Sequence, residues 1–253
     1  MKAKLGCWDP GAESGEGLGS GPGSLRPMFV RAWNATIAAL VVAAIIVQIV
    51  IAIGVNGTPH DVSVGLLRGS SLPGRIMRVL SFFTIQSNLL CGIVSAQLAA
   101  KPSRDGAAWR AFRLAALFGI TVTGIVYSTV LARIHEPHGT AETAVNTLVH
   151  YIVPIMMVVG WLAFGPRPRI KVATVLWSLM FPVLWFAYTL TRGAIWKWYP
   201  YPFVDVASHG YPRVVGNALI VTVVFAVLAW LFAQGDRRLP ATPTAPAQFA
   251  PPG

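Results

Sequence analysis

A stripe of polar side chains lies inside an otherwise apolar segment, where polar groups are costly and are often functional. Its members recur at spacings of three and four, the pattern of one helical face: Thr84, Ser87, Asn88, Cys91 and Ser95. A structural explanation is also open, because Ser, Thr and Asn often hydrogen-bond between membrane helices or to their own helix.

His150 is a second polar residue inside an apolar segment, and its imidazole could be functional. Of the five histidines, it is the one that falls within an apolar segment. It shares a helical face with Asn146 and Pro154, four residues before and after it. A buried imidazole that is hydrogen-bonded to a neighbouring hydroxyl would account for the same residue without catalysis.

The elements that must position these residues are membrane helices. The chain has 253 residues, of which 55% are hydrophobic and only 11% charged, whereas soluble domains carry roughly 25% charged residues. Its apolar runs are each near the ~20 residues that a helix needs to cross ~30 Å of hydrocarbon. We therefore predict an all-α polytopic integral membrane protein with short loops. Its six transmembrane helices are predicted at residues 32–54, 78–99, 111–132, 144–164, 172–191 and 213–234, with kinks at Pro154 and Pro182.

Two tails are predicted to flank the membrane domain of residues 28–235. Residues 1–27 and 236–253 are rich in Gly, Ser or Pro and are expected to be disordered. Met28 is an alternative translation start to Met1. The two tails and the loops after the second and fourth predicted helices together hold 13 Lys or Arg, and the other three loops hold 7. This bias places both tails in the cytoplasm of a multi-pass protein of the cell membrane.

The net charge of +11 does not indicate a nucleic-acid partner, because the basic residues lie between the apolar runs. In this orientation, Thr84 and His150 both lie about 9 Å inside their helices from the non-cytoplasmic side. The loop between the fifth and sixth helices ends on that side too. It combines aromatic residues, two prolines and Asp205, so it could cap a cavity between the two helices.

Three motifs occur in this order: Phe82-x-Thr84, Asn146-x-x-x-His150 with Pro154, and Trp198-x-x-Tyr201-Pro202-Phe203-x-Asp205. Together they resemble the androgen-induced and androgen-dependent TFPI-regulating membrane protein family and its bacterial relatives. The similarity covers about residues 30–235.

The resemblance implies a membrane hydrolase that cleaves fatty acid esters of hydroxy fatty acids without a cofactor. Carried over by motif, Thr84 is the nucleophile and His150 the base, with Tyr201 and Asp205 in supporting positions. The chain departs from the animal pattern, in which proline follows the histidine by five residues and glutamate replaces Asp205. Membrane lipids and a lipid-ester substrate are the expected partners.

Acyl transfer to Thr84 would also require a hydrogen-bond donor for the oxyanion. Asn88 lies one turn beyond Thr84 on the same helical face, and Asn146 lies one turn before His150. These two amides are the candidate donors.

Two other classes of function remain open. A metal-dependent membrane hydrolase would use the loop groups His135-Glu136-x-His138, His60-Asp61 and Asp205-x-x-x-His209, since His with carboxylate is the usual hydrolytic zinc set. A non-catalytic lipid-binding or scaffold protein would retain the polar stripe for helix packing. Ion-coupled transport is disfavoured, because no Asp or Glu lies well inside a predicted helix.

Overall fold

The chain is described by a computed structural model over residues 22–54, 70–135, 137 and 139–240. Throughout these residues the regular structure is helical. Six of the helical segments are long and apolar enough to cross a membrane, which confirms the predicted all-α, multi-pass membrane fold. The elements are α1 (Pro22–Gly54), α3 (Leu72–Ser81), α4 (Phe83–Ala100), α5 (Ala107–Thr129), η1 (Leu131–Arg133), α6 (Gly139–Thr147), η2 (Leu148–Ile152), α7 (Val153–Phe164), α8 (Val172–Ser178), α9 (Met180–Trp196), η3 (Pro202–Val204) and α10 (Val206–Arg238).

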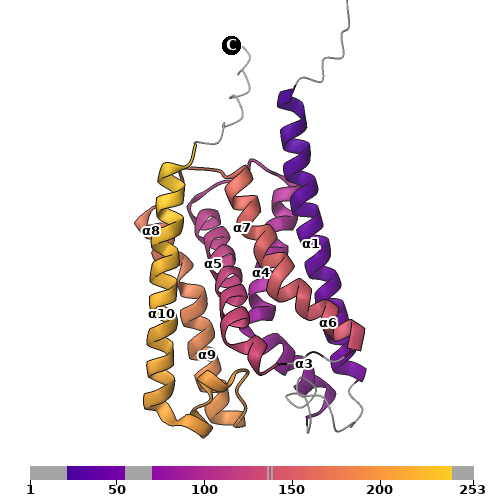
Figure 1. The fold of residues 1–253 in the computed structure, drawn as a ribbon, viewed down its shortest axis with the longest axis vertical. Helices are drawn as coiled ribbons and strands as arrows, with labels where there is room; N and C mark the ends of the chain where they lie inside the picture. Colours follow the sequence, from indigo (N-terminus) through magenta and orange to yellow (C-terminus); the bar gives the residue numbers. More distant parts are fainter. Residues whose placement is uncertain (1–21, 55–69, 136, 138, 241–253) are drawn as a thin grey trace, which may run out of the picture.

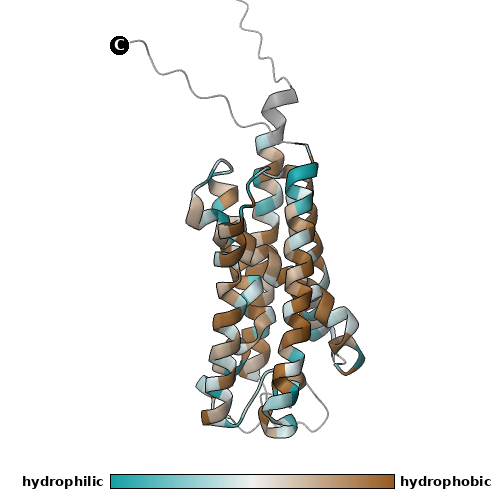
Figure 2. Cartoon of the chain, turned by 90° about the vertical axis from the view of Figure 1, so that its left-hand side faces the viewer, coloured by the Kyte–Doolittle hydropathy of each residue, from teal (hydrophilic) through white to brown (hydrophobic). Residues whose placement is uncertain are grey.

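The spanning helices form an elongated bundle whose long axis follows the helix axes (Figure 1). The start of α1 and the end of α10 lie at the same end of the bundle, whereas α3, α6 and the segment between α9 and α10 lie at the other. Figure 2 shows hydrophobic residues along the length of the helices and hydrophilic ones near their ends. Outward-facing apolar side chains on α1 and α10, among them Val42, Ile46, Leu219 and Val223, are more than half exposed, as a lipid-facing surface requires.

The interior is centred on α4, α5 and α7, and it is tightly packed. Cys91, Val94, Phe118 and Val153 belong to its main apolar cluster and are almost fully buried. Gly119 of α5 permits a close approach of α4, because a Cβ atom there would lie 2.8 Å from the Ser87 hydroxyl. Small residues at such crossings are typical of membrane helix packing.

Three predicted helices are interrupted, each for a local reason. The second is broken at Phe82, whose backbone is extended with φ −67° and ψ 133°. The fifth is divided at Leu179, three residues before Pro182, which has no N–H to continue the helical bonding. The fourth contains a π turn, η2, that ends just before Val153 and Pro154.

The predicted boundaries between the tails and the membrane domain lie too far inside the chain. The helix α1 starts at Pro22, so residues 22–27 extend the first helix and the prediction that they are disordered is wrong. At the other end α10 continues to Arg238, and Asp236 is almost fully buried and accepts hydrogen bonds from two backbone N–H groups. The rest of both predicted tails, residues 1–21 and 241–253, lies outside the described residues.

Candidate active site

The break at Phe82 places Thr84 in the first turn of a membrane helix. Phe82 is the N-cap of α4, so Thr84 is the second residue of that helix. The first N–H groups of a helix have no intrahelical acceptor. The N–H of Thr84 instead donates to the Tyr201 hydroxyl over 3.2 Å, which ties the helix start to the segment between α9 and α10.

The structure brings Thr84 and His150 into direct contact. Thr84 Oγ1 lies 3.3 Å from His150 Nε2. On the other side of the ring, His150 Nδ1 lies 3.1 Å from the backbone oxygen of Asn146. A carbonyl oxygen can only accept, so Nδ1 carries the proton in the neutral ring and Nε2 is the acceptor for the Thr84 hydroxyl. This is the arrangement that general-base activation of a hydroxyl requires.

The Tyr201 hydroxyl makes a second hydrogen bond with Thr84, and its direction follows from that of the Thr84–His150 bond. Its hydroxyl oxygen also lies 3.2 Å from Thr84 Oγ1. Since the proton of Thr84 is directed at His150, the Tyr201 hydroxyl donates to Oγ1 while it accepts from the Thr84 N–H. Burial raises the pKa of the Tyr201 phenol, which keeps this donor protonated.

The π turn η2 positions His150. It spans Leu148–Ile152 and therefore contains the histidine. Pro154 has no N–H to donate to the His150 carbonyl, and a helix accommodates such a residue by widening locally. Gly124 of α5 packs against this point, where an added Cβ would lie 3.4 Å from the His150 carbonyl oxygen and 3.2 Å from Pro154 Cβ. π turns of this kind occur frequently at functional sites.

Asn88 links the helix turn that carries Thr84 to the π turn that carries His150. Its amide nitrogen donates to the backbone oxygens of Thr84, over 2.9 Å, and of Val149, over 3.1 Å. Both amide protons are therefore engaged, and the geometry gives Asn88 a positioning role in place of the expected donation to an oxyanion. Asn146, by contrast, lines the adjoining cavity.

The pair faces a cavity of about 340 Å³. The expected cap is present, because Pro200, Tyr201 and Pro202 line it. Most of its lining is apolar, which suits an acyl chain. The other lining residues are Gln48, Val79, Phe82, Thr84, Ile85, Tyr127, Leu131, Ile134, His135, Glu142, Val145, Asn146, Val149 and His150.

Sequence reasoning missed two functional candidates in this cavity, Tyr127 and Glu142, and considered His135 only as a metal ligand. The Tyr127 ring is stacked on His150, with centroids 3.7 Å apart and planes 14° from parallel. Its hydroxyl lies 3.3 Å from His135 Nδ1, and His135 Nε2 lies 3.8 Å from a carboxylate oxygen of Glu142. The clue in the sequence was a tyrosine inside an apolar helix, followed by His135 and Glu142 near the start of the next helix.

Asp205 does not reach the Thr84–His150 pair. Its carboxylate caps α10, where it accepts from the N–H groups of Ala207 and Ser208 over 2.9 and 3.2 Å and from the Ser208 hydroxyl over 2.7 Å. It supports the site indirectly, because the loop with Tyr201 ends at this cap.

The expected metal groups are only partly described. His60, Asp61, Glu136 and His138 lie outside the described residues. Within the described ranges, no cluster of three or more His, Cys, Asp or Glu side chains could hold a metal ion.

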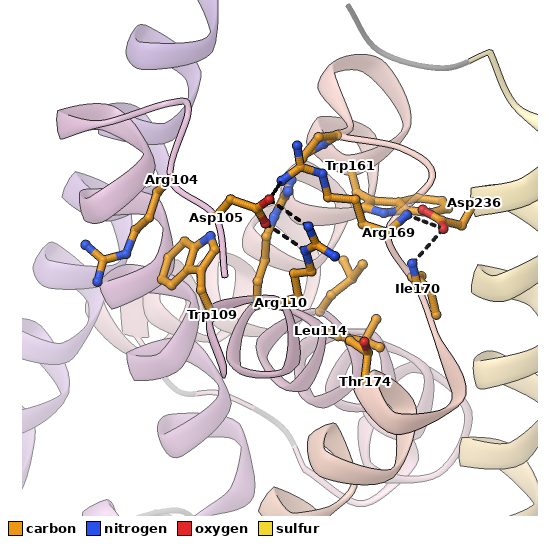
Figure 3. A pocket seen from close by; sticks show the side chains of 13 residues that line it. Arg104, Asp105, Trp109, Arg110, Leu114, Trp161, Arg169, Ile170, Thr174 and Asp236 are labelled. Carbon is orange, nitrogen blue, oxygen red and sulfur yellow. Dashed lines mark hydrogen bonds and ion pairs between the residues drawn. The ribbon is translucent and has the colours of Figure 1, made fainter. Parts of the chain in front are cut away.

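A second polar cluster lies at the opposite end of the bundle, beside the end of α10 (Figure 3). Asp105 receives two hydrogen bonds of 2.7 Å from Arg110 and forms an ion pair of 2.6 Å with Arg169. The Arg110 hydrogen bonds hold the pKa of Asp105 well below its usual range. Asp236 accepts from the backbone N–H groups of Arg169 and Ile170. The cluster links the α4–α5 and α7–α8 loops to the end of α10, and the adjoining cavity is only about 40 Å³.

Comparisons with known proteins identify no relative. The chain matches no protein-family model, no curated protein and no solved structure.

Proposed function

We propose that this chain is an integral membrane hydrolase of lipid esters, with Thr84 as nucleophile and His150 as general base. The observation that carries the proposal is the 3.3 Å contact between Thr84 Oγ1 and His150 Nε2, in a ring whose other nitrogen donates to a carbonyl. The pair faces a largely apolar cavity. A nucleophile, an oriented base and an adjoining apolar volume together favour acyl transfer from a lipid.

The reaction proceeds in two halves. Thr84 Oγ1 attacks the ester carbonyl while His150 Nε2 takes its proton, which gives a tetrahedral oxyanion. Collapse breaks the bond to the alcohol, which leaves with the proton from His150, and an acyl-threonine remains. Water then attacks this ester with His150 again as base, and the fatty acid is released.

Two groups at the cavity could stabilise the oxyanion. The amide of Asn146 lines the cavity. The first turn of α4 also carries N–H groups without intrahelical acceptors and the positive end of a helix dipole. Donors of this kind stabilise the charge that develops in acyl transfer.

The proposed substrate is a fatty acid ester of a hydroxy fatty acid or a related lipid, in keeping with the family that the motifs resemble. The orientation favoured by the basic residues places both termini in the cytoplasm of a cell-membrane protein. The cavity lies at the end of the bundle away from the start of α1 and the end of α10, which in this orientation is the non-cytoplasmic side.

The test uses purified protein in detergent and in liposomes. Hydrolysis of a branched fatty-acyl ester of a hydroxy fatty acid and labelling by a fluorophosphonate are measured for wild type, Thr84→Ala and His150→Ala. Thr222→Ala and His209→Ala are the matched controls, since both positions are exposed on α10. We expect activity and labelling to disappear in the first two variants and to persist in the controls.

Other outcomes would change the proposed class of function. Hydrolysis that persists in Thr84→Ala and is abolished by a chelator would indicate a metal-dependent hydrolase. A wild type that neither hydrolyses esters nor reacts with the probe would favour a lipid-binding or scaffold protein.

A further inference from the structure

His150 lacks the acidic partner that a catalytic histidine commonly has. In a Ser-His-Asp triad, a buried carboxylate bonded to Nδ1 stabilises the imidazolium that forms when the base takes a proton. Here Nδ1 donates to the neutral backbone oxygen of Asn146. A carbonyl dipole compensates only part of a full charge in a low-dielectric site. The positive charge on His150 therefore calls for a further source of negative potential.

The face of the Tyr127 ring is in the right place to supply it. The two rings are nearly parallel at 3.7 Å between centroids, and Tyr127 is only 4% exposed. The face of an aromatic ring carries negative potential and attracts a cation placed over it. Proton transfer from Thr84 to His150 creates that cation directly against the ring.

Two further residues connect this ring to a carboxylate. The Tyr127 hydroxyl lies 3.3 Å from His135 Nδ1, and His135 Nε2 faces Glu142 at 3.8 Å. A carboxylate beside Nε2 favours the tautomer with its proton there, so Nδ1 accepts from the Tyr127 hydroxyl. That hydrogen bond increases the electron density of the phenol. The negative charge of Glu142 is thus linked through His135 to the ring that covers His150.

We propose that Glu142, His135 and Tyr127 act as the electrostatic partner of His150, in place of a carboxylate on Nδ1. This inference rests on the proposed hydrolase function. All three are positioning residues, because they act on the reacting atoms through His150. The titratable groups that surround His150 in the described part of the chain are Tyr127 of α5, His135 after η1, Glu142 of α6, Tyr151 of its own helix and Tyr201 of the loop.

The decisive variants separate the ring from its hydroxyl. Tyr127→Leu removes the ring and should reduce kcat by roughly 10- to 30-fold, the upper range for a desolvated cation–π contact. Tyr127→Phe keeps the ring but breaks the link to His135, so a smaller loss of about 3- to 10-fold is expected. Glu142→Gln should match Tyr127→Phe. Both changes interrupt the same series of contacts from Glu142 through His135 to Tyr127. The double variant should therefore have no lower kcat than either single variant.

The pH profile distinguishes this role from a purely structural one. The acid limb of kcat reports protonation of the base in the enzyme–substrate complex. If Glu142, His135 and Tyr127 stabilise the imidazolium, Glu142→Gln and Tyr127→Phe lower the pKa of His150. The acid limb of the kcat profile then moves to lower pH, and the maximal kcat falls as well. A variant that merely disturbs packing lowers the plateau and leaves the limb in place. Tyr211→Phe, at an exposed position on α10, is the matched control and should leave both unchanged.

Each result decides the inference. Thermal unfolding in detergent is measured for every variant, and Tyr127→Phe and Glu142→Gln, which preserve shape, carry the conclusion if Tyr127→Leu fails to fold. An active wild type whose rate and acid limb are unaffected by these two changes would overturn this inference alone. Additive losses without a shift of the limb would overturn it too. A wild type without Thr84-dependent labelling would overturn the proposed function, and this inference with it.

Discussion

Replacing Tyr201 by phenylalanine should separate positioning of the nucleophile from binding of the lipid. The phenol oxygen accepts from the Thr84 N–H and donates to Thr84 Oγ1, each over 3.2 Å. Phenylalanine retains the ring, which stacks on Phe203 with centroids 5.2 Å apart. The cavity wall is therefore preserved while both hydrogen bonds are lost.

The expected size of the effect follows from the charge on Thr84. In the proposed reaction Oγ1 becomes negative as its proton moves to His150, and a hydrogen bond to a charged group contributes about 1.5–3 kcal/mol. Losing it should lower kcat by roughly 10- to 100-fold, with little change in KM. The N–H of Thr84 also loses its buried acceptor, which should reduce the free energy of unfolding by about 1–3 kcal/mol.

Initial rates of ester hydrolysis, normalised to the amount of folded protein, measure the first effect, and thermal unfolding in detergent measures the second. Tyr211→Phe is again the matched control. Since the pKa of the Tyr201 phenol is raised above its ordinary value of about 10, the group stays protonated up to that pH. The ratio of wild-type to variant rates should thus be constant between pH 7 and 9. A variant with wild-type kcat and an unchanged unfolding midpoint would refute the assigned role.

Three further predictions concern the support of the site and the opposite end of the bundle. Gly193→Ala should displace the loop that carries Tyr201 and abolish most activity, because the new Cβ would lie 2.0 Å from the Tyr199 ring; Gly216→Ala, with nothing within 4 Å, should be harmless in the same hydrolysis assay. Asp236→Ala leaves the partly buried N–H groups of Arg169 and Ile170 without their acceptor, so the free energy of unfolding should fall by about 2 kcal/mol, seen as a lower thermal midpoint. Asp105 has a depressed pKa in the folded state, so its stabilising contribution is present above an unfolded-state pKa of about 3.9 and disappears as the pH falls below it. The stability difference between wild type and Asp105→Asn should accordingly be present at pH 6 and diminish towards pH 3; a difference independent of pH would contradict this.

The sequence was sufficient for the class of fold, and it singled out Thr84 and His150, whose side chains the structure places in contact. Hydrophobic runs of spanning length predict membrane helices, since lipid leaves backbone groups no partner outside their own segment. The shared depth of Thr84 and His150 could also be deduced, because the alternating direction of the helices fixes which ends meet. Their separation of 3.3 Å could not, since it depends on the packing of α4 against η2 through Asn88.

The remaining parts of the site depend on contacts that periodicity does not encode. Tyr127 is one of many aromatic and aliphatic residues in α5, and its sequence position alone does not distinguish it. Its stacking on His150 is what indicates a role. Asn88 looks like an available donor, yet both of its amide protons are engaged by backbone oxygens. Asp205 belongs to a motif with Tyr201, but a helix cap holds it away from the pair. In each case the side chain's partner lies on a different element or on a turn whose geometry the pattern leaves open.

The site is assembled where the helices depart from regularity. An uninterrupted membrane helix satisfies its own backbone groups and has few means to direct an N–H or a carbonyl at a neighbouring side chain. The break at Phe82 frees the N–H of Thr84 for Tyr201, and the π turn carries His150. Because these interruptions lie at one end of the bundle, they can supply polar backbone groups to a cavity that is otherwise apolar. A change that restored a regular helix at either point would therefore be expected to preserve the fold and remove the chemistry.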